Sequence, residues 1–126
     1  MVYFLFLTLF IFEINAKDFS DIQWKNRVLI ASTFDETQLK KISKFQDEYN
    51  CQISTRNLKF VIFKNNKNTN YDTPDFIVGT SGFWLIGYDG TLKAFFSDTR
   101  KLEQIFDLID QMPIRKKEMI DSRLQC

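Results

Sequence analysis

The stretch VLIASTFDETQLKK, residues 28–41, contains a short apolar run, a polar junction and the start of an amphipathic helix. The apolar run 27–32 contains two β-branched residues and is too short for a typical buried helix, so it predicts a buried strand. Asp35, followed three residues later by Gln38, has the pattern of a capping box and predicts the beginning of a helix. Apolar residues at helical spacing carry this helix to about residue 50: Leu39, Ile42, Phe45 and Tyr49. The stretch therefore predicts a strand that leads directly into a helix.

The next segment predicts a second strand and a loop. Residues 58–63, LKFVIF, are apolar and bounded by polar residues, as in a short strand. The asparagine-rich stretch 64–74 has no periodicity and predicts a loop. Thr73-Pro74 predicts a short helix with Thr73 as its N-cap and Pro74 at its first position, ending at Gly79.

Residues 82–96, GFWLIGYDGTLKAFF, predict a β-hairpin. Asp89-Gly90 lies between two apolar runs, which is a strong sequence signal for a two-residue hairpin turn. Asp98 is then suited to cap the next helix, and Pro113, after Met112, to begin a last helix that ends near Leu124. The first of these helices has an apolar stripe: Leu102, Ile105, Phe106 and Ile109.

This order of elements predicts one α/β domain. A βαβ unit followed by ββα gives a mixed sheet flanked by helices, because the crossover makes the first two strands parallel and the hairpin adds an antiparallel pair. This is the minimal thioredoxin architecture.

The N-terminal residues 1–16, MVYFLFLTLFIFEINA, predict a signal peptide. The apolar run of about ten residues ends at Glu13 and is followed by the small residue Ala16, and it is too short to span a bilayer. The alternative is an uncleaved membrane anchor. Cleavage leaves a domain of residues 17–126 without a transmembrane span, and predicts a secreted or periplasmic protein.

The composition excludes much of enzyme chemistry. The chain contains no histidine and only two cysteines, which removes histidine-activated nucleophiles and zinc sites built from histidine or cysteine. After cleavage, 17 basic residues stand against 15 acidic ones, so no electrostatic argument favours nucleic acid. We expect no metal and no cofactor, and whether the chain is an enzyme stays open, with a non-enzymatic role favoured.

Three segments in order resemble a known family: WKNRVL at 24–29, LIGYDG at 85–90 and IDQMPIR at 109–115. They include the motif residues Asp89, Gly90, Met112 and Pro113. They resemble a domain-of-unknown-function family of bacterial secreted proteins, related to the DUDES modules of animal extracellular-matrix and sushi-repeat proteins. The resemblance implies a thioredoxin-like, peroxiredoxin-related fold outside the cytoplasm, with no established activity.

The residues that a dithiol oxidoreductase needs are absent from the expected positions. Thr37 and Lys40 stand near the two cysteine positions of a CxxC motif, and neither can supply a thiolate. We therefore predict no catalytic residues. Cys51 and Cys126 form either one structural disulfide or two idle thiols. A redox role for Cys51, as in peroxiredoxin-like or thiol-exchange chemistry, is the alternative.

The candidate ligand-binding residues are Trp24, Arg27 and Arg115, which would line an anion or peptide site beside the sheet. The structural alternative is that Trp24 is an aromatic at the edge of the core and that the arginines pair with Asp21 or Asp110. The sequence favours a binding or interaction module for an unknown protein or a small anionic ligand. A structural component of the envelope or matrix is a further alternative.

Overall fold

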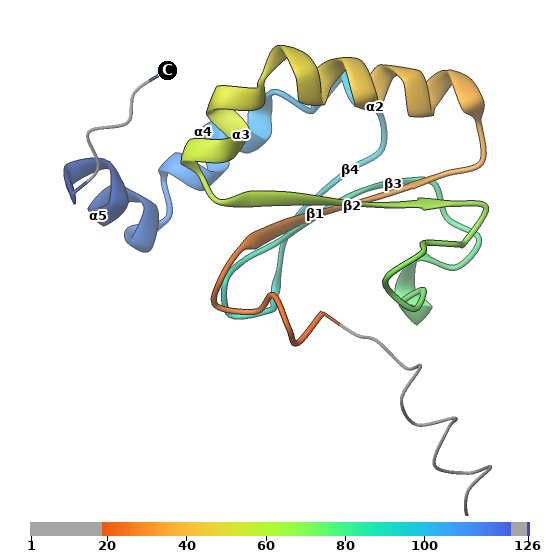
Figure 1. The fold of residues 1–126 in the computed structure, drawn as a ribbon, viewed down its shortest axis with the longest axis horizontal. Coiled ribbons are helices and arrows are strands. Elements are labelled where there is room, and N and C mark those ends of the chain that lie inside the picture. Colours follow the sequence, from red (N-terminus) through yellow and green to blue (C-terminus); the bar gives the residue numbers. More distant parts are fainter. Residues whose placement is uncertain (1–18, 122–125) are drawn as a thin grey trace, which may run out of the picture.

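The computed structural model describes residues 19–121 and 126. Figure 1 shows a four-stranded sheet with the strand order β2-β1-β3-β4. The elements are β1 (Arg27–Thr33), α2 (Glu36–Glu48), α3 (Asn50–Thr55), β2 (Leu58–Lys64), η1 (Asp75–Ile77), β3 (Gly82–Ile86), β4 (Leu92–Phe96), η2 (Thr99–Lys101), α4 (Gln104–Asp110) and α5 (Pro113–Asp121). Strands β1 and β2 are parallel, whereas β1–β3 and β3–β4 are antiparallel. The predicted βαβ–ββα order and mixed sheet are confirmed, and they are compatible with a thioredoxin-like fold.

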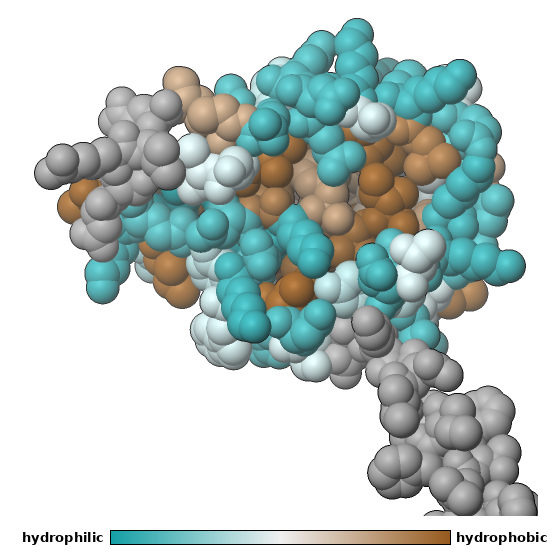
Figure 2. All heavy atoms as spheres, in the orientation of Figure 1, coloured by the Kyte–Doolittle hydropathy of each residue, from teal (hydrophilic) through white to brown (hydrophobic). Residues whose placement is uncertain are grey.

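The central strand β1 is buried along its whole length, as its continuous apolar run requires. Leu29 and Ala31 pack in one apolar cluster with residues of α2 and α4. Val28 and Ile30 pack in a second cluster on the other face, with side chains from the turn at residues 19–25, which precedes β1, and from the segment between β2 and β3. Polar side chains cover the outer surface of α2, and apolar atoms show beneath it over the sheet (Figure 2).

The first helix is followed by a second helix that the sequence did not predict. The predicted end at about Asn50 agrees with the end of α2 at Glu48, but a second helix, α3, follows after a break at Tyr49 and continues to Thr55. Ile53, four residues after Tyr49, packs against the core and continues the apolar stripe. Cys51 consequently lies inside α3.

The N-cap of α2 is correct, but the predicted capping box is incomplete. The Asp35 carboxylate accepts a hydrogen bond from the Thr37 N–H at 2.9 Å. The Asp35 N–H, which Gln38 should satisfy in a capping box, donates instead to the Thr33 hydroxyl at 3.1 Å. The acceptor for the Asp35 N–H is thus Thr33 on β1 and not Gln38 on α2.

The hairpin has a longer turn than the predicted two residues. The Gly87 N–H donates to Thr91 O and the Gly90 N–H to Gly87 O, both at 3.0 Å, so residues 88–90 form the loop. Gly90 has a φ of 80°, the left-handed conformation that closes a three-residue hairpin loop. The Asp89 carboxylate accepts hydrogen bonds from the Thr91 N–H and hydroxyl, which holds the turn.

Two predicted helix starts are shifted. Thr73 does not cap η1, since its hydroxyl donates to Asn66 O, and Pro74 precedes this 3-10 turn instead of beginning it. Asp98 accepts a hydrogen bond from the Arg100 N–H at 2.8 Å and caps η2, whereas α4 begins only at Gln104. The four residues of the predicted stripe, Leu102, Ile105, Phe106 and Ile109, are all buried.

The last helix begins at Pro113, as predicted. Its expected end near Leu124 and the predicted signal peptide, residues 1–16, lie outside the described residues. In the part of the chain that the structure describes, no helix is both long enough and apolar enough to cross a bilayer.

Candidate functional site

The three segments on which the family resemblance rests meet at one hollow beside the hairpin. We call it the hairpin-tip hollow, and its volume is about 230 Å³. Its lining residues are Trp24, Arg27, Gly87, Tyr88, Asp89, Lys93, Met112, Pro113 and Ile114. All of these except Lys93 come from residues 24–29, 85–90 and 109–115. Segments more than 80 residues apart in the sequence therefore build a single surface.

Trp24 stands at the rim of this hollow in an unusual backbone conformation. Its φ is 69°, in the left-handed region, which costs a non-glycine residue roughly 1–2 kcal/mol. Its N–H donates to Tyr88 O at 2.8 Å, so the hairpin tip fixes the strained residue. The side chain is 67% exposed, so Trp24 is not an aromatic at the edge of the core.

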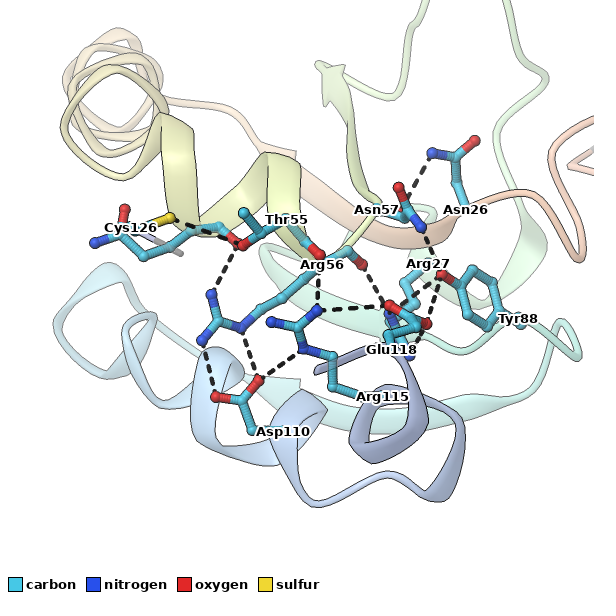
Figure 3. Close-up of polar contacts among 11 residues, drawn as sticks. Asn26, Arg27, Thr55, Arg56, Asn57, Tyr88, Asp110, Arg115, Glu118 and Cys126 are labelled. Carbon is cyan, nitrogen blue, oxygen red and sulfur yellow. Dashed lines mark hydrogen bonds and ion pairs between the residues drawn. The ribbon is translucent and has the colours of Figure 1, made fainter. Parts of the chain in front are cut away.

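Arg27 begins β1 and its side chain is buried, with 1% exposed. Its Nη2 donates to Glu118 Oε1 at 3.0 Å and its Nη1 to Arg56 O at 2.8 Å, and its guanidinium stacks 4.2 Å from the centre of the Tyr88 ring (Figure 3). A planar and weakly hydrated guanidinium tolerates such a position better than an ammonium would. No described residue accepts a hydrogen bond from Arg27 Nε.

The Tyr88 hydroxyl links the hairpin to the C-terminal helix. It accepts a hydrogen bond from Asn57 Nδ2 at 3.0 Å and donates one to Glu118 Oε1 at 3.1 Å. Burial, reinforced by the Glu118 charge, raises the pKa of Tyr88 against the opposing effects of Asn57 and Arg27. Tyr88 thus keeps its proton at neutral pH and acts as a donor.

Arg115 lies next to the hollow in a cluster of charges that we call the charge clasp. Its residues are Arg27, Arg56, Arg115, Asp110 and Glu118. Arg115 contacts Asp110 Oδ1 at 3.1 Å and Thr55 O at 2.7 Å, and Arg56 contacts the same Asp110 carboxylate at 2.8 and 3.0 Å (Figure 3).

Of the two acidic partners expected for the arginines, Asp110 is the one observed. Asp21 lies elsewhere, where its carboxylate accepts a hydrogen bond from the Tyr71 hydroxyl at 3.4 Å. Burial alone would raise the pKa of Asp110, but the hydrogen bonds and charges of Arg56 and Arg115 outweigh it and leave the pKa below its ordinary value.

A second, exposed ion pair lies at the rim of the hollow. Asp89 contacts Lys93 Nζ at 3.2 Å. Hydrogen bonds from the Thr91 hydroxyl and N–H, with a smaller effect of Lys93, lower the pKa of Asp89 to about 2. The rim charges therefore compensate each other at neutral pH.

Cys51 and Cys126 form a disulfide that joins α3 to the segment after α5, with a Cα–Cα distance of 5.7 Å. Of the two structural alternatives left open by the sequence, the disulfide is the one present. Within residues 19–121 and 126, no group of three or more histidine, cysteine, aspartate or glutamate side chains is arranged to hold a metal ion.

The structure brings Trp24 and Arg27 together in the lining of the hollow. Arg115 does not line the hollow and belongs to the charge clasp, where it contacts Asp110 and Glu118. Sequence reasoning missed Arg56 and Asn57, and it assigned no site role to the Tyr88 hydroxyl. Tyr88 lies inside the LIGYDG segment, which could have drawn attention to it. Arg56 gives no such signal, because its partner Asp110 is 54 residues away.

Comparison with known proteins gives one match. No curated protein and no solved structure matches the chain. A family model matches residues 18–118, which is most of the chain. The protein belongs to the family described as "Domain of unknown function (DUF4174)".

Proposed function

We propose that this protein is an exported, non-enzymatic binding module that takes a protein partner at the hairpin-tip hollow. In this proposal the domain is thioredoxin-like, lacks the catalytic CxxC motif, and is related to the DUDES modules of extracellular proteins. The absence of cysteine from the junction between β1 and α2 supports a non-enzymatic role. The participation of both cysteines in one disulfide supports it further.

The conformation of Trp24 is the observation that carries this proposal. Backbone strain at a bulky residue persists only where the surroundings impose it, and such residues cluster at ligand clamps and functional sites. Here the strain holds an indole in the solvent instead of burying it. A strained and exposed tryptophan contributes little to the core, so a role in binding explains it better than a role in folding.

The rim of the hollow suits an apolar side chain of a protein partner. Ile114 is 51% exposed, and Pro113 next to it is also exposed, so both lie open to solvent as Trp24 does. Tryptophan is enriched among the residues that dominate binding energy at protein interfaces. A volume of about 230 Å³ is below the range of roughly 300–1,000 Å³ typical of sites for drug-sized molecules. The hollow therefore fits one inserted side chain better than a whole small molecule.

The test is selection of peptides from a random phage-displayed library on the purified chain with its disulfide intact. Selected peptides should bind the wild type and lose at least tenfold in affinity on Trp24→Ala. The chain has two tryptophans, Trp24 and the buried Trp84, so their indole N–H signals in NMR spectra should separate. Peptide binding should shift the Trp24 signal more than that of Trp84.

Phe34→Ala is the matched control. Phe34 is an exposed aromatic directly after β1, at the opposite end of the strand from Trp24, and the seven residues of β1 between them span roughly 20 Å. Peptides should bind this variant as they bind the wild type. Failure to select any peptide, or equal binding to Trp24→Ala and Phe34→Ala, would contradict the proposal.

Export has its own test. The intact mass of the chain purified from its native host should correspond to residues 17–126. A mass that includes residues 1–16 would contradict a cleaved signal peptide.

A further inference from the structure

The Glu118 carboxylate occupies a cradle of donors contributed by other parts of the chain. Arg27, on β1, donates to the two Glu118 oxygens at distances of 3.0 and 3.4 Å. Tyr88, in the hairpin, donates its hydroxyl hydrogen to Glu118 Oε1 at 3.1 Å. Arg115 Nη1 lies 3.6 Å from Oε2. Figure 3 shows these groups converging on Glu118. Two-point contact by a guanidinium together with a hydroxyl donor is a typical arrangement for recognising a carboxylate.

Most residues of the helix that supplies Glu118 are exposed. Among residues 113–120 of α5, only Arg115 is buried. Met119 and Ile120 are 42% and 84% exposed, so the helix covers little apolar surface next to Glu118. The Glu118 side chain itself is 21% exposed, whereas that of Arg27 is 1% exposed. Glu118 is thus the member of this pair that solvent can reach.

The charge balance favours an anion at this position. The charge clasp holds three guanidinium groups and two carboxylates, which gives one net positive charge with Glu118 in place and two without it. A buried guanidinium without a partner is strongly unfavourable, so a departing Glu118 has to be replaced by another anion.

We propose that Arg27 and Tyr88 form a carboxylate-binding site in which Glu118 is the internal occupant, and that a carboxylate of the partner replaces it. The inference rests on the proposed function, because Arg27 and Tyr88 also line the hairpin-tip hollow. It specifies the ligand class as a peptide that inserts an apolar side chain into the hollow and places a neighbouring carboxylate on Arg27. That carboxylate is either an acidic side chain or the C-terminus of the peptide.

The test compares two small probes on the full chain with its disulfide intact. N-acetyl-phenylalanine carries a ring and a carboxylate, and N-acetyl-phenylalaninamide carries the same ring without the charge. Glu118→Gln keeps the size of the internal occupant and removes its charge. NMR titration of this variant should show the acid binding at least tenfold more tightly than the amide, and at least tenfold more tightly than the acid binds the wild type.

Two further variants make the result specific. Asp107→Asn removes an exposed carboxylate from α4 and should leave the affinity of the acid as in the wild type. Tyr88→Phe, added to Glu118→Gln, removes the donating hydroxyl but keeps the ring, and should weaken binding of the acid and not of the amide. If Glu118→Gln does not fold, the wild type is titrated, where the acid must shift the Arg27 Nε–H signal and the amide must not.

The outcomes separate this inference from the proposed function. Equal binding of acid and amide to Glu118→Gln, with the Trp24 signal shifted, overturns the carboxylate site and leaves the hollow as a binding site for apolar groups. Binding of neither probe overturns the carboxylate site as well. Selection of library peptides that depend on Trp24 but contain no preferred carboxylate would also overturn the carboxylate site, by an independent route.

Discussion

The two ends of β1 differ sharply in chemistry. At its C-terminal end, Thr33 and Asp35 exchange hydrogen bonds that shape the start of α2, and Phe34 is exposed. At its N-terminal end lie a strained tryptophan, a fully buried arginine and, through α3, the disulfide. The C-terminal end of β1 thus caps a helix, whereas its N-terminal end holds a left-handed tryptophan and a buried charge, both of which lower stability on their own.

The unusual features lie at the end of β1 where ligand sites of this fold class are less common. In open α/β sheets, ligands usually bind beyond the carboxyl ends of the parallel strands. In this protein the carboxyl end of β1 carries the cap of α2 and an ion pair between Lys64 and Glu36, whereas the amino ends of β1 and β2, together with the hairpin tip, carry the charge clasp and the hollow. A left-handed tryptophan and buried charges lower stability unless something compensates them, so their occurrence together at the amino end of β1 points to a function there.

The largest expected effect comes from the disulfide at the N-terminal end. Replacing both Cys51 and Cys126 by serine opens a loop whose ends are 75 residues apart, which should lower the free energy of unfolding by about 4 kcal/mol in the chain-entropy model. Urea unfolding of the oxidised wild type and the double variant measures this difference. The reduced wild type is the control and should match the variant; a loss below about 1 kcal/mol would show that the disulfide is dispensable.

Arg27→Ala should have the next largest effect. It leaves Glu118 and Arg56 O without their buried partner, which should cost about 3 kcal/mol in the free energy of unfolding. Lys44→Ala is the control, because Lys44 forms an exposed ion pair with Glu48 on α2, and its loss should cost less than about 0.5 kcal/mol. If the two variants lost similar amounts of unfolding free energy, the buried ion pair of Arg27 would stabilise the fold no more than an exposed one.

At the other end of β1, Asp35→Ala should have a smaller effect. Loss of the N-cap bond to Thr37 should lower the free energy of unfolding by about 1 kcal/mol. Binding of peptides selected on the wild type should not change, as fluorescence anisotropy can show. Loss of binding in Asp35→Ala would show that the C-terminal end of β1 also takes part in binding.

The smallest expected effect concerns acid stability. Because the pKa of Asp110 is lower in the folded chain than its ordinary value of 3.8, the folded state binds this proton less readily than the unfolded state. The contribution of ionised Asp110 to the free energy of unfolding is therefore fully present above pH 3.8, the ordinary pKa, and is lost as the pH falls through the lower pKa of the folded chain. Asp110→Asn should therefore lose less stability than the wild type between pH 5 and pH 2, measured as urea midpoints. Parallel pH profiles would contradict this role of Asp110.

The fold could be predicted from the sequence because its signals are local. The apolar run before Thr33, the cap at Asp35 and the turn around Gly90 each lie within a few residues of the element that they specify. The errors occurred where a group forms a hydrogen bond with a partner outside the local pattern. The Asp35 N–H donates to the Thr33 hydroxyl, and the Thr73 hydroxyl donates to Asn66 O.

The candidate site could be predicted only in part. Trp24 and Arg27 stand close together in the sequence and in the structure, and Arg115 belongs to a segment that meets them. The partners Arg56 and Glu118 come from elements 29 and 91 residues away from Arg27, so their pairing depends on the completed fold. Nothing in the sequence near Trp24 indicates its left-handed backbone either, since no glycine or asparagine marks that position.

A binding role for Trp24 is tested most directly by replacing Trp24 with glycine and measuring stability and peptide binding on the same sample. Glycine accepts a left-handed φ without strain, so Trp24→Gly should keep or raise the free energy of unfolding, by up to about 1 kcal/mol, while binding of the selected peptides falls at least tenfold. Asn65→Gly, at another residue with positive φ, is the control and should leave binding intact. A loss of stability with binding retained would contradict the account, because Trp24 would then serve the fold and not a partner.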